Sequence, residues 1–97
     1  MKAAYVIDTP LPAICPGTAA VVAIGPASTQ SVAINSQIVR LLATADCHVV
    51  FGEDPAATGN DTPLPANLPE YFVFVPGHKV AVIQDSATGV LYITPAA

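Results

Sequence analysis

Short runs of β-branched and apolar residues, separated by prolines, glycines and small polar residues, follow one another along the chain. The apolar residues do not recur at helical spacing, and runs of this composition are typical of β-strands. The predicted strands are Ala4–Ile7, Ala19–Ile24, Ser31–Ile34, Ile38–Thr44, Cys47–Phe51, Tyr71–Val75, Lys79–Gln84 and Val90–Thr94. About eight short strands at this spacing indicate an all-β fold.

The expected architecture is a single antiparallel β-sandwich domain of jelly-roll type that spans residues 1–97. An immunoglobulin-like sandwich or a small barrel stays open as an alternative, because the pattern does not give the order of the strands. Two proline-rich segments interrupt the pattern, an irregular N-terminal segment at residues 8–17 and a long loop at residues 53–69. Their prolines stiffen them, which favours arms that lie on a neighbouring chain.

The alternation of apolar and polar residues fails in the C-terminal strands. In the run from Tyr71 to Val75, one face carries Tyr71, Val73 and Val75, and the other carries Phe72 and Phe74. A strand with one solvated face normally shows polar residues on that face. We therefore expect a partner chain to cover one face, with a tolerated surface of small apolar residues as the alternative.

The composition points the same way. Of the 97 residues, 53% are hydrophobic and only 10% are charged, whereas about 25% is the usual charged share. A domain of this size buries only about 60–65% of the surface of its unfolded chain. We infer that other chains cover part of this surface.

The charge of the chain excludes several partners. Lys2, Arg40 and Lys79 are the only basic side chains, and the formal net charge is −4. Binding to nucleic acid or to an anionic membrane needs clustered basic residues, so neither is expected. No apolar run approaches the roughly 20 residues of a membrane span. The apolar run before Asp8 is too short for a signal peptide, so export is not supported.

No residues form a recognisable catalytic or metal site. His48 and His78 could be combined with Asp46, Cys47 and Glu70. Asp46, Cys47 and His48 are consecutive, however, so they cannot all point to one side of a strand. The same alternation separates Cys47 from His48 as a nucleophile and its base. We therefore expect no enzyme activity, no metal, no other cofactor and no small-molecule substrate.

The acidic loop residues and the cysteines allow two further interpretations. Glu53, Asp54 and Asp61 could bind calcium, but their spacing fits no calcium loop, so solvated carboxylates are expected. A disulfide between Cys15 and Cys47 stays open, since two cysteines do not make a framework. Cys47 lies in an apolar run, which favours a small buried hydrophobic residue.

Arg40 lies in a strand that is otherwise apolar. An arginine there needs a carboxylate such as Glu70 or Asp46, an edge position, or an intersubunit contact. In the long loop, Leu64 and Leu68 are expected as anchors on a neighbour. The complete set of expected partner-binding residues is Arg40, Pro55, Pro63, Leu64, Pro65, Leu68, Tyr71 and Phe72.

Residues 37–84 carry a distinctive order of elements. A strand with an arginine is followed by a turn with Asp and by a strand that ends in Phe-Gly. Glu-Tyr-Phe, a Pro-Gly turn and Lys-Val-Ala-Val-Ile come later. The matching residues are Arg40, Asp46, Cys47, Phe51, Gly52, Pro55, Ala56, Glu70, Tyr71, Phe72, Pro76, Gly77, Lys79, Val80, Ala81, Val82 and Ile83. This pattern resembles a family of small virion structural proteins that tailed bacteriophages encode near their capsid genes.

The resemblance implies a capsid decoration (cement) protein. Such a protein would be made in the host cytoplasm and would sit on the outer capsid surface of the virion, as a homotrimer that bridges major capsid proteins. A head–tail connector or a fibre-associated binding module is the alternative that the resemblance leaves open.

Overall fold

A computed structural model describes residues 19–96, so the predicted strand Ala4–Ile7 lies outside the described residues. Within this range the chain forms eight strands and no helix. The strands are β1 (Ala20–Ile24), β2 (Thr29–Gln30), β3 (Ile38–Ala43), β4 (Cys47–Gly52), β5 (Thr62–Leu64), β6 (Glu70–Val73), β7 (Lys79–Gln84) and β8 (Gly89–Pro95). Accordingly, the described part holds no helix that could span a membrane.

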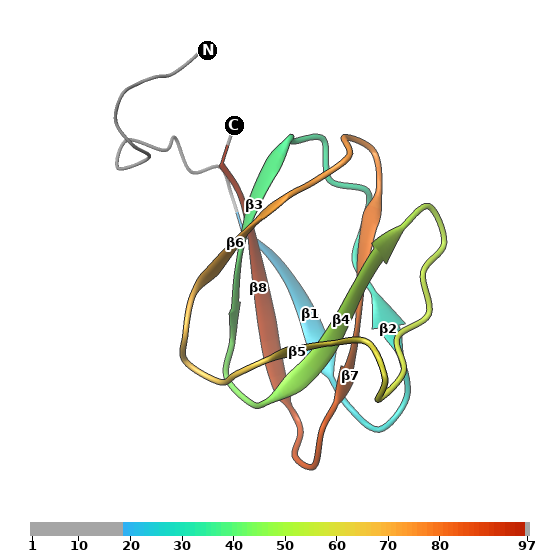
Figure 1. Cartoon of the computed structure of the whole chain (residues 1–97), viewed down its shortest axis with the longest axis vertical. Coiled ribbons are helices and arrows are strands. Elements are labelled where there is room, and N and C mark those ends of the chain that lie inside the picture. The colour runs from blue at the N-terminus through green and yellow to red at the C-terminus, as the bar shows by residue number, and fades with distance from the viewer. Residues whose placement is uncertain (1–18, 97) are drawn as a thin grey trace.

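The strands form two four-stranded sheets that face each other (Figure 1). Sheet A has the order β1-β8-β3-β6, and sheet B has the order β2-β7-β4-β5. β1 pairs with β8, β2 with β7, β3 with β6 and β4 with β5, all antiparallel. The described chain is therefore one long hairpin with its tip between β4 and β5. It is rolled so that β3 also pairs with β8, and β4 with β7. This order is that of a jelly roll, and the expected sandwich is confirmed.

Alternating side chains from both sheets fill the core. In β3, Val39, Leu41 and Ala43 are buried, and the residues between them point outward. From the other sheet, Val80 and Val82 of β7 are equally buried. Because the side-chain period of a strand is two, these buried positions also determine which residues of each strand face outward.

Three phenylalanines join the two sheets. Phe51 of β4 meets Phe72 of β6 with ring centroids 5.5 Å apart, and it meets Phe74 at 5.1 Å. Both pairs have the edge-to-face geometry that aromatic rings prefer. Phe72, which the sequence suggested as a partner-binding residue, therefore packs within the domain.

The strand predicted at Ser31–Ile34 is wrong, because regular pairing ends at β2, one residue before it. The N–H of Ser31 donates to the carbonyl of Val80 at 2.8 Å, and the Ser31 hydroxyl accepts from the N–H of Val80 at 3.0 Å. The side chain thus takes the place of a backbone acceptor. The segment stays beside β7 without continuing the ladder.

The long loop expected at residues 53–69 contains a strand, β5. Pro63 lies in it, opposite His48 of β4. A proline cannot donate to a ladder, but β5 is the edge strand of sheet B, where this is tolerated. Leu64 follows, and at 1% exposed it belongs to the core. Its expected place as a surface anchor is therefore wrong.

The first half of the loop is attached to its own domain. The side-chain amide of Gln30 donates to Oδ1 of Asp54 at 3.0 Å, and the N–H of Ala57 donates to Oγ of Ser28 at 2.8 Å. Both bonds connect the tip of the hairpin to the segment around β2. These contacts account for the loop within one chain, without a neighbour.

The connection from β5 to β6 is fastened to the turn before β4. Oδ1 of Asp46 accepts from the N–H of Ala66 at 2.8 Å. The next residue, Asn67, has a φ of 61° and donates its N–H to the carbonyl of Ala43 at 2.7 Å. Asparagine tolerates this left-handed conformation better than most residues do. The two bonds hold the end of the long loop against β3.

Asp46→Ala is expected to lower the free energy of unfolding by about 1 kcal/mol, because the N–H of Ala66 loses its acceptor. Asp46→Asn keeps an oxygen at this position and should retain most of the stability. Urea denaturation followed by circular dichroism measures both variants. Equal losses in the two variants would mean that the bond to Ala66 is not what Asp46 contributes.

Candidate functional site

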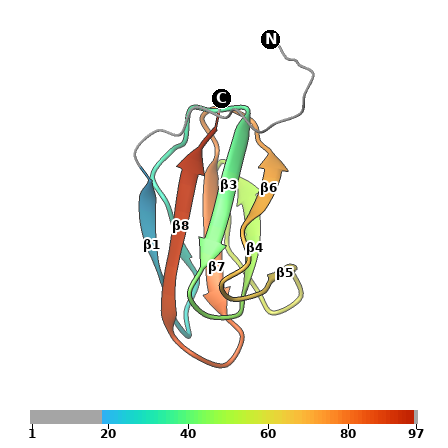
Figure 2. The same cartoon turned by 90° about the vertical axis from the view of Figure 1, so that its left-hand side faces the viewer.

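The outer side of sheet A carries an extended apolar surface, here called the apolar face. Figure 2 looks onto this sheet with sheet B behind it. In the strand register, Val21, Tyr92 and Leu42 form one row, and Ile38 and Val73 form another. The full apolar face consists of Val21, Ala23, Ile38, Arg40, Leu42, Tyr71, Val73, Val90, Tyr92 and Thr94.

Several of these side chains are open to solvent. Val73 is 86% exposed, Val21 is 62% exposed and Tyr71 is 50% exposed. The expectation that Tyr71 and Val73 share an apolar face opposite Phe72 is confirmed by the register. Contiguous apolar surface of this kind marks interaction sites in soluble proteins. The apolar face is therefore the first candidate for function.

Arg40 is the one charged side chain of the apolar face. It lies half-buried between Thr94 and Tyr71 in the register. It makes no ion pair or hydrogen bond with any residue in the range 19–96. A partly desolvated cation without a partner is unfavourable, so the position suits a partner that brings a carboxylate.

The expected salt bridge of Arg40 with Glu70 or Asp46 is wrong for two reasons. Glu70 lies opposite Leu41, which points into the core, so Glu70 and Arg40 are on different sides of sheet A. Asp46 instead binds the N–H of Ala66. The expected edge position is also wrong, because β3 lies between β8 and β6.

The expected partner-binding residues lie in several different places. Tyr71 belongs to the apolar face, and Leu68, which is 52% exposed, lies in the connection between β5 and β6. Pro55 is half-buried in the hairpin tip. Pro63 and Pro65 line a pocket beside β5. The structure therefore brings together Arg40 and Tyr71 on the apolar face, and Pro63, Leu64 and Pro65 at the pocket.

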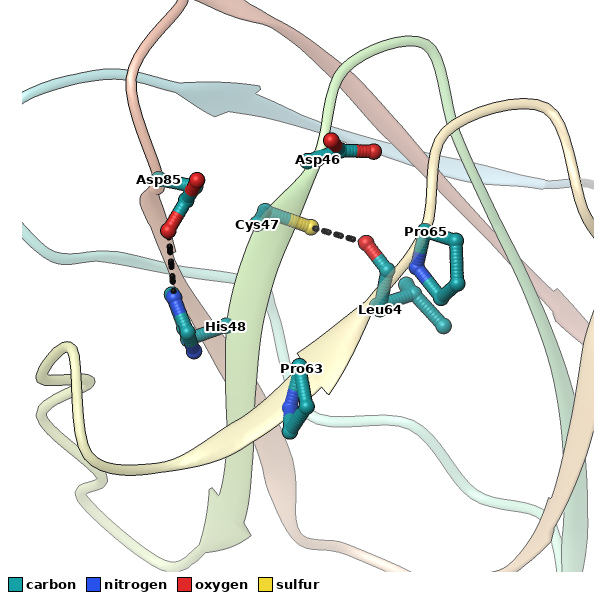
Figure 3. A pocket seen from close by; sticks show the side chains of 7 residues that line it. All are labelled: Asp46, Cys47, His48, Pro63, Leu64, Pro65 and Asp85. Atoms are coloured by element: carbon teal, nitrogen blue, oxygen red, sulfur yellow. Dashed lines mark hydrogen bonds and ion pairs between the residues drawn. The ribbon is translucent and has the colours of Figure 1, made fainter.

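This pocket, the second candidate, has a volume of about 250 Å³. Its lining comes from β4, β5 and the residue after β7 (Figure 3). The lining residues are Asp46, Cys47, His48, Pro63, Leu64, Pro65 and Asp85. As the sequence suggested, Cys47 and His48 point to opposite sides of β4: Cys47 is buried, and His48 reaches Asp85.

Cys47 is a poor nucleophile in this setting. Its thiol is 1% exposed and lies 3.9 Å from the carbonyl oxygen of Leu64. Burial, together with the nearby charge of Asp46, raises the pKa of Cys47 to about 11. The thiolate is the reactive form, so this cysteine behaves as a small core residue. Its possible disulfide partner, Cys15, lies outside the described residues.

His48 is held between two acceptors. Its Nε2 is 3.1 Å from Oδ1 of Asp85, and its Nδ1 is 3.1 Å from the carbonyl oxygen of Asp61. Neither oxygen can donate, so both bonds form only when both ring nitrogens carry a proton. The bond to the Asp85 carboxylate raises the pKa of His48 above its ordinary 6.5, and the bond to the Asp61 carbonyl raises it further by a smaller amount. In its protonated form, the imidazole thus clamps the hairpin tip to the turn after β7.

The clamp should make stability depend on pH. Because the folded pKa of His48 is raised, its contribution is fully present below the unfolded pKa of 6.5 and is lost as pH rises through the folded pKa. The effect should be at most about 1 kcal/mol, since Asp85 is largely exposed. Urea denaturation between pH 5 and pH 9 should show this loss in the wild type and in His78→Gln, but not in His48→Gln. An unchanged profile in His48→Gln would contradict the clamp.

Two of the acidic loop residues considered for calcium accept hydrogen bonds within the domain. Asp54 accepts from Gln30, and Asp61 accepts the N–H of Thr58 at 2.7 Å. Among residues 19–96, no group of three or more His, Cys, Asp or Glu side chains could hold a metal ion. The contact between His48 and Asp85 could not be predicted from the sequence, because it depends on the register of β4 against β7.

The apolar face is therefore the stronger candidate. The pocket beside β5 offers a buried thiol and a histidine already bonded at both nitrogens, whereas the apolar face offers exposed apolar side chains and a half-buried cation. This arrangement suits association with another protein surface. In comparisons with known proteins, no family model, no curated protein and no solved structure matches this chain.

Proposed function

We propose that this protein is a non-enzymatic structural protein that assembles through its apolar face and decorates a phage capsid. The observation that carries the proposal is the apolar face itself, with Val73, Val21 and Tyr71 at least half exposed. The low share of charged residues supports association, and the resemblance of residues 37–84 to small virion proteins supports the capsid as its setting.

In this proposal the jelly roll is a rigid adhesive unit. Copies pack together through the apolar face, as a homotrimer, and exposed loop residues such as Leu68 bridge neighbouring major capsid proteins on the outer surface. Many symmetric copies on one shell then gain avidity from weak individual contacts.

The test is the place and number of copies on purified virions, determined by cryo-electron microscopy and quantitative mass spectrometry. Hundreds of copies spread over the shell are expected. A dozen or fewer copies at one vertex would overturn decoration and favour a head–tail connector or a fibre-associated module. Absence from the particle would overturn a virion function altogether.

A further inference from the structure

The apolar face has a specific chemical demand. Its side chains are apolar except for Thr94 and Arg40, and Arg40 lacks a partner among residues 19–96. A complementary surface must therefore be apolar and must bring one carboxylate close to the centre of the face. The register and the alternation of β3 place Leu42, Ile38 and Tyr71 around Arg40 on this face.

One segment of this chain has that composition. Ala4-Tyr5-Val6-Ile7-Asp8 combines a short apolar run, for which the sequence predicts a strand, with a single carboxylate at its end. These residues lie outside the described range. The apolar run matches the apolar side chains of the face, and the carboxylate of Asp8 matches the charge of Arg40.

The other carboxylates of the chain are less suited to Arg40. Four of them already accept hydrogen bonds within their own domain: Asp46, Asp54, Asp61 and Asp85. Glu70 lies on the inner side of sheet A, and Glu53 follows β4 in sheet B. Of the seven acidic residues, this leaves Glu53 and Asp8. Glu53 follows a strand already paired within sheet B, so Asp8, which follows an apolar run, is the better match.

The linker length favours a second copy over the same chain. Ala20 and Leu41 both pair with Ile93, so β1 and Arg40 are separated by two strand spacings, about 10 Å. Residues 9–19 include Pro10, Pro12 and Pro16. A proline-rich run of this length favours an extended conformation that spans about 35 Å. That is well beyond the distance to the chain's own Arg40, which favours an Arg40 on a second copy.

We propose that the apolar face binds the segment Ala4–Asp8 of a second copy of this chain, with the carboxylate of Asp8 paired to Arg40. Each copy passes its N-terminal segment to the next, which closes a symmetric oligomer. The segment covers the exposed apolar side chains, and the ion pair sets its register. This deepens the self-association part of the proposed function and is independent of the capsid.

Charge reversal tests the contact in the full-length protein. Sedimentation velocity from low to high micromolar concentration should show an oligomer for the wild type. Asp8→Arg and Arg40→Asp should each weaken association at least about tenfold, because like charges then face each other. Mixing the two variants should restore the contacts between unlike copies, two of the three in a closed trimer, since each supplies what the other lacks. Lys79→Asp, which reverses a basic residue on sheet B, should associate like the wild type.

Several outcomes would overturn the proposal. A monomeric wild type, or single variants that associate like the wild type, would exclude the contact. Failure of the mixture, with association recovered in the double variant, would place the segment on its own chain. Circular dichroism spectra of each variant check that it is folded. Because no capsid is present, these results are separate from the place of the protein on virions.

Discussion

Leu64→Ala is expected to lower the free energy of unfolding by about 2–5 kcal/mol, the usual range for a leucine removed from a core. Leu64 is 1% exposed, although it lies in a strand of only three residues at the edge of sheet B. Its side chain belongs to the same buried cluster as Val49 of β4. Shortening it leaves a cavity that the edge strand can only partly close. A domain of this size has about 5–15 kcal/mol to lose.

Leu68→Ala is the matched control, since Leu68 is 52% exposed in the next connection. It should change the free energy of unfolding by less than about 0.5 kcal/mol. Urea denaturation followed by circular dichroism compares the two. If neither substitution lowered the free energy of unfolding, Leu64 would not be a core residue, and its interpretation as a surface anchor would be restored. If Leu68→Ala proved the more damaging, the placement of β5 would be wrong.

The longer strands were predicted from the sequence almost residue by residue. The run Lys79–Gln84 coincides with β7, and Ile38–Thr44 exceeds β3 by one residue. In both, apolar residues occupy alternate positions that the core needs, such as Val39 and Leu41 in β3 and Val80 and Val82 in β7. The inner positions therefore repeat with period two, and local sequence is enough to find them.

The short strands could not be predicted in this way. β5 contains Pro63, which argues against a strand unless its edge position is known. β2 ends where the hydroxyl of Ser31 replaces a backbone acceptor of the ladder. Both depend on what lies beside them, β4 in one case and β7 in the other. Pairing between segments that are far apart in the sequence cannot be deduced from the local pattern of residues.

In the candidate site, too, features set by local alternation could be predicted, whereas contacts between distant strands could not. That Tyr71 and Val73 share one side of the strand followed from their alternation with Phe72, but which side is exposed did not. The partner of Arg40 did not, because Glu70 is near it in the register but lies on the other side of the sheet. The contact of His48 with Asp85 likewise needed the pairing of β4 with β7. A sequence can thus indicate that a face is apolar before it indicates which charges meet.

Gly89→Ala should destabilise the fold by about 1–3 kcal/mol, as inserting an extra methyl group into a packed site does. A Cβ at Gly89 would lie 2.7 Å from Oγ1 of Thr44 and 2.9 Å from Cβ of Ala45. Thr44 cannot simply move away. Its Oγ1 accepts from the N–H of Val90 at 2.9 Å, and its N–H donates to the carbonyl of Val90 at 2.9 Å. Relief of the clash therefore costs hydrogen bonds where β8 begins.

Gly59→Ala separates this clash from the general effect of replacing glycine. Nothing lies within 4 Å of a Cβ at Gly59, so the variant should be neutral, or more stable by up to about 1 kcal/mol because its unfolded chain is less free. Thermal and urea denaturation of both variants give the comparison. Similar stability for the two alanines would mean that the turn before β8 yields easily. A loss only in Gly89→Ala would instead show that the β3–β8 pairing begins at a site with no room for a side chain, which is why this position carries glycine.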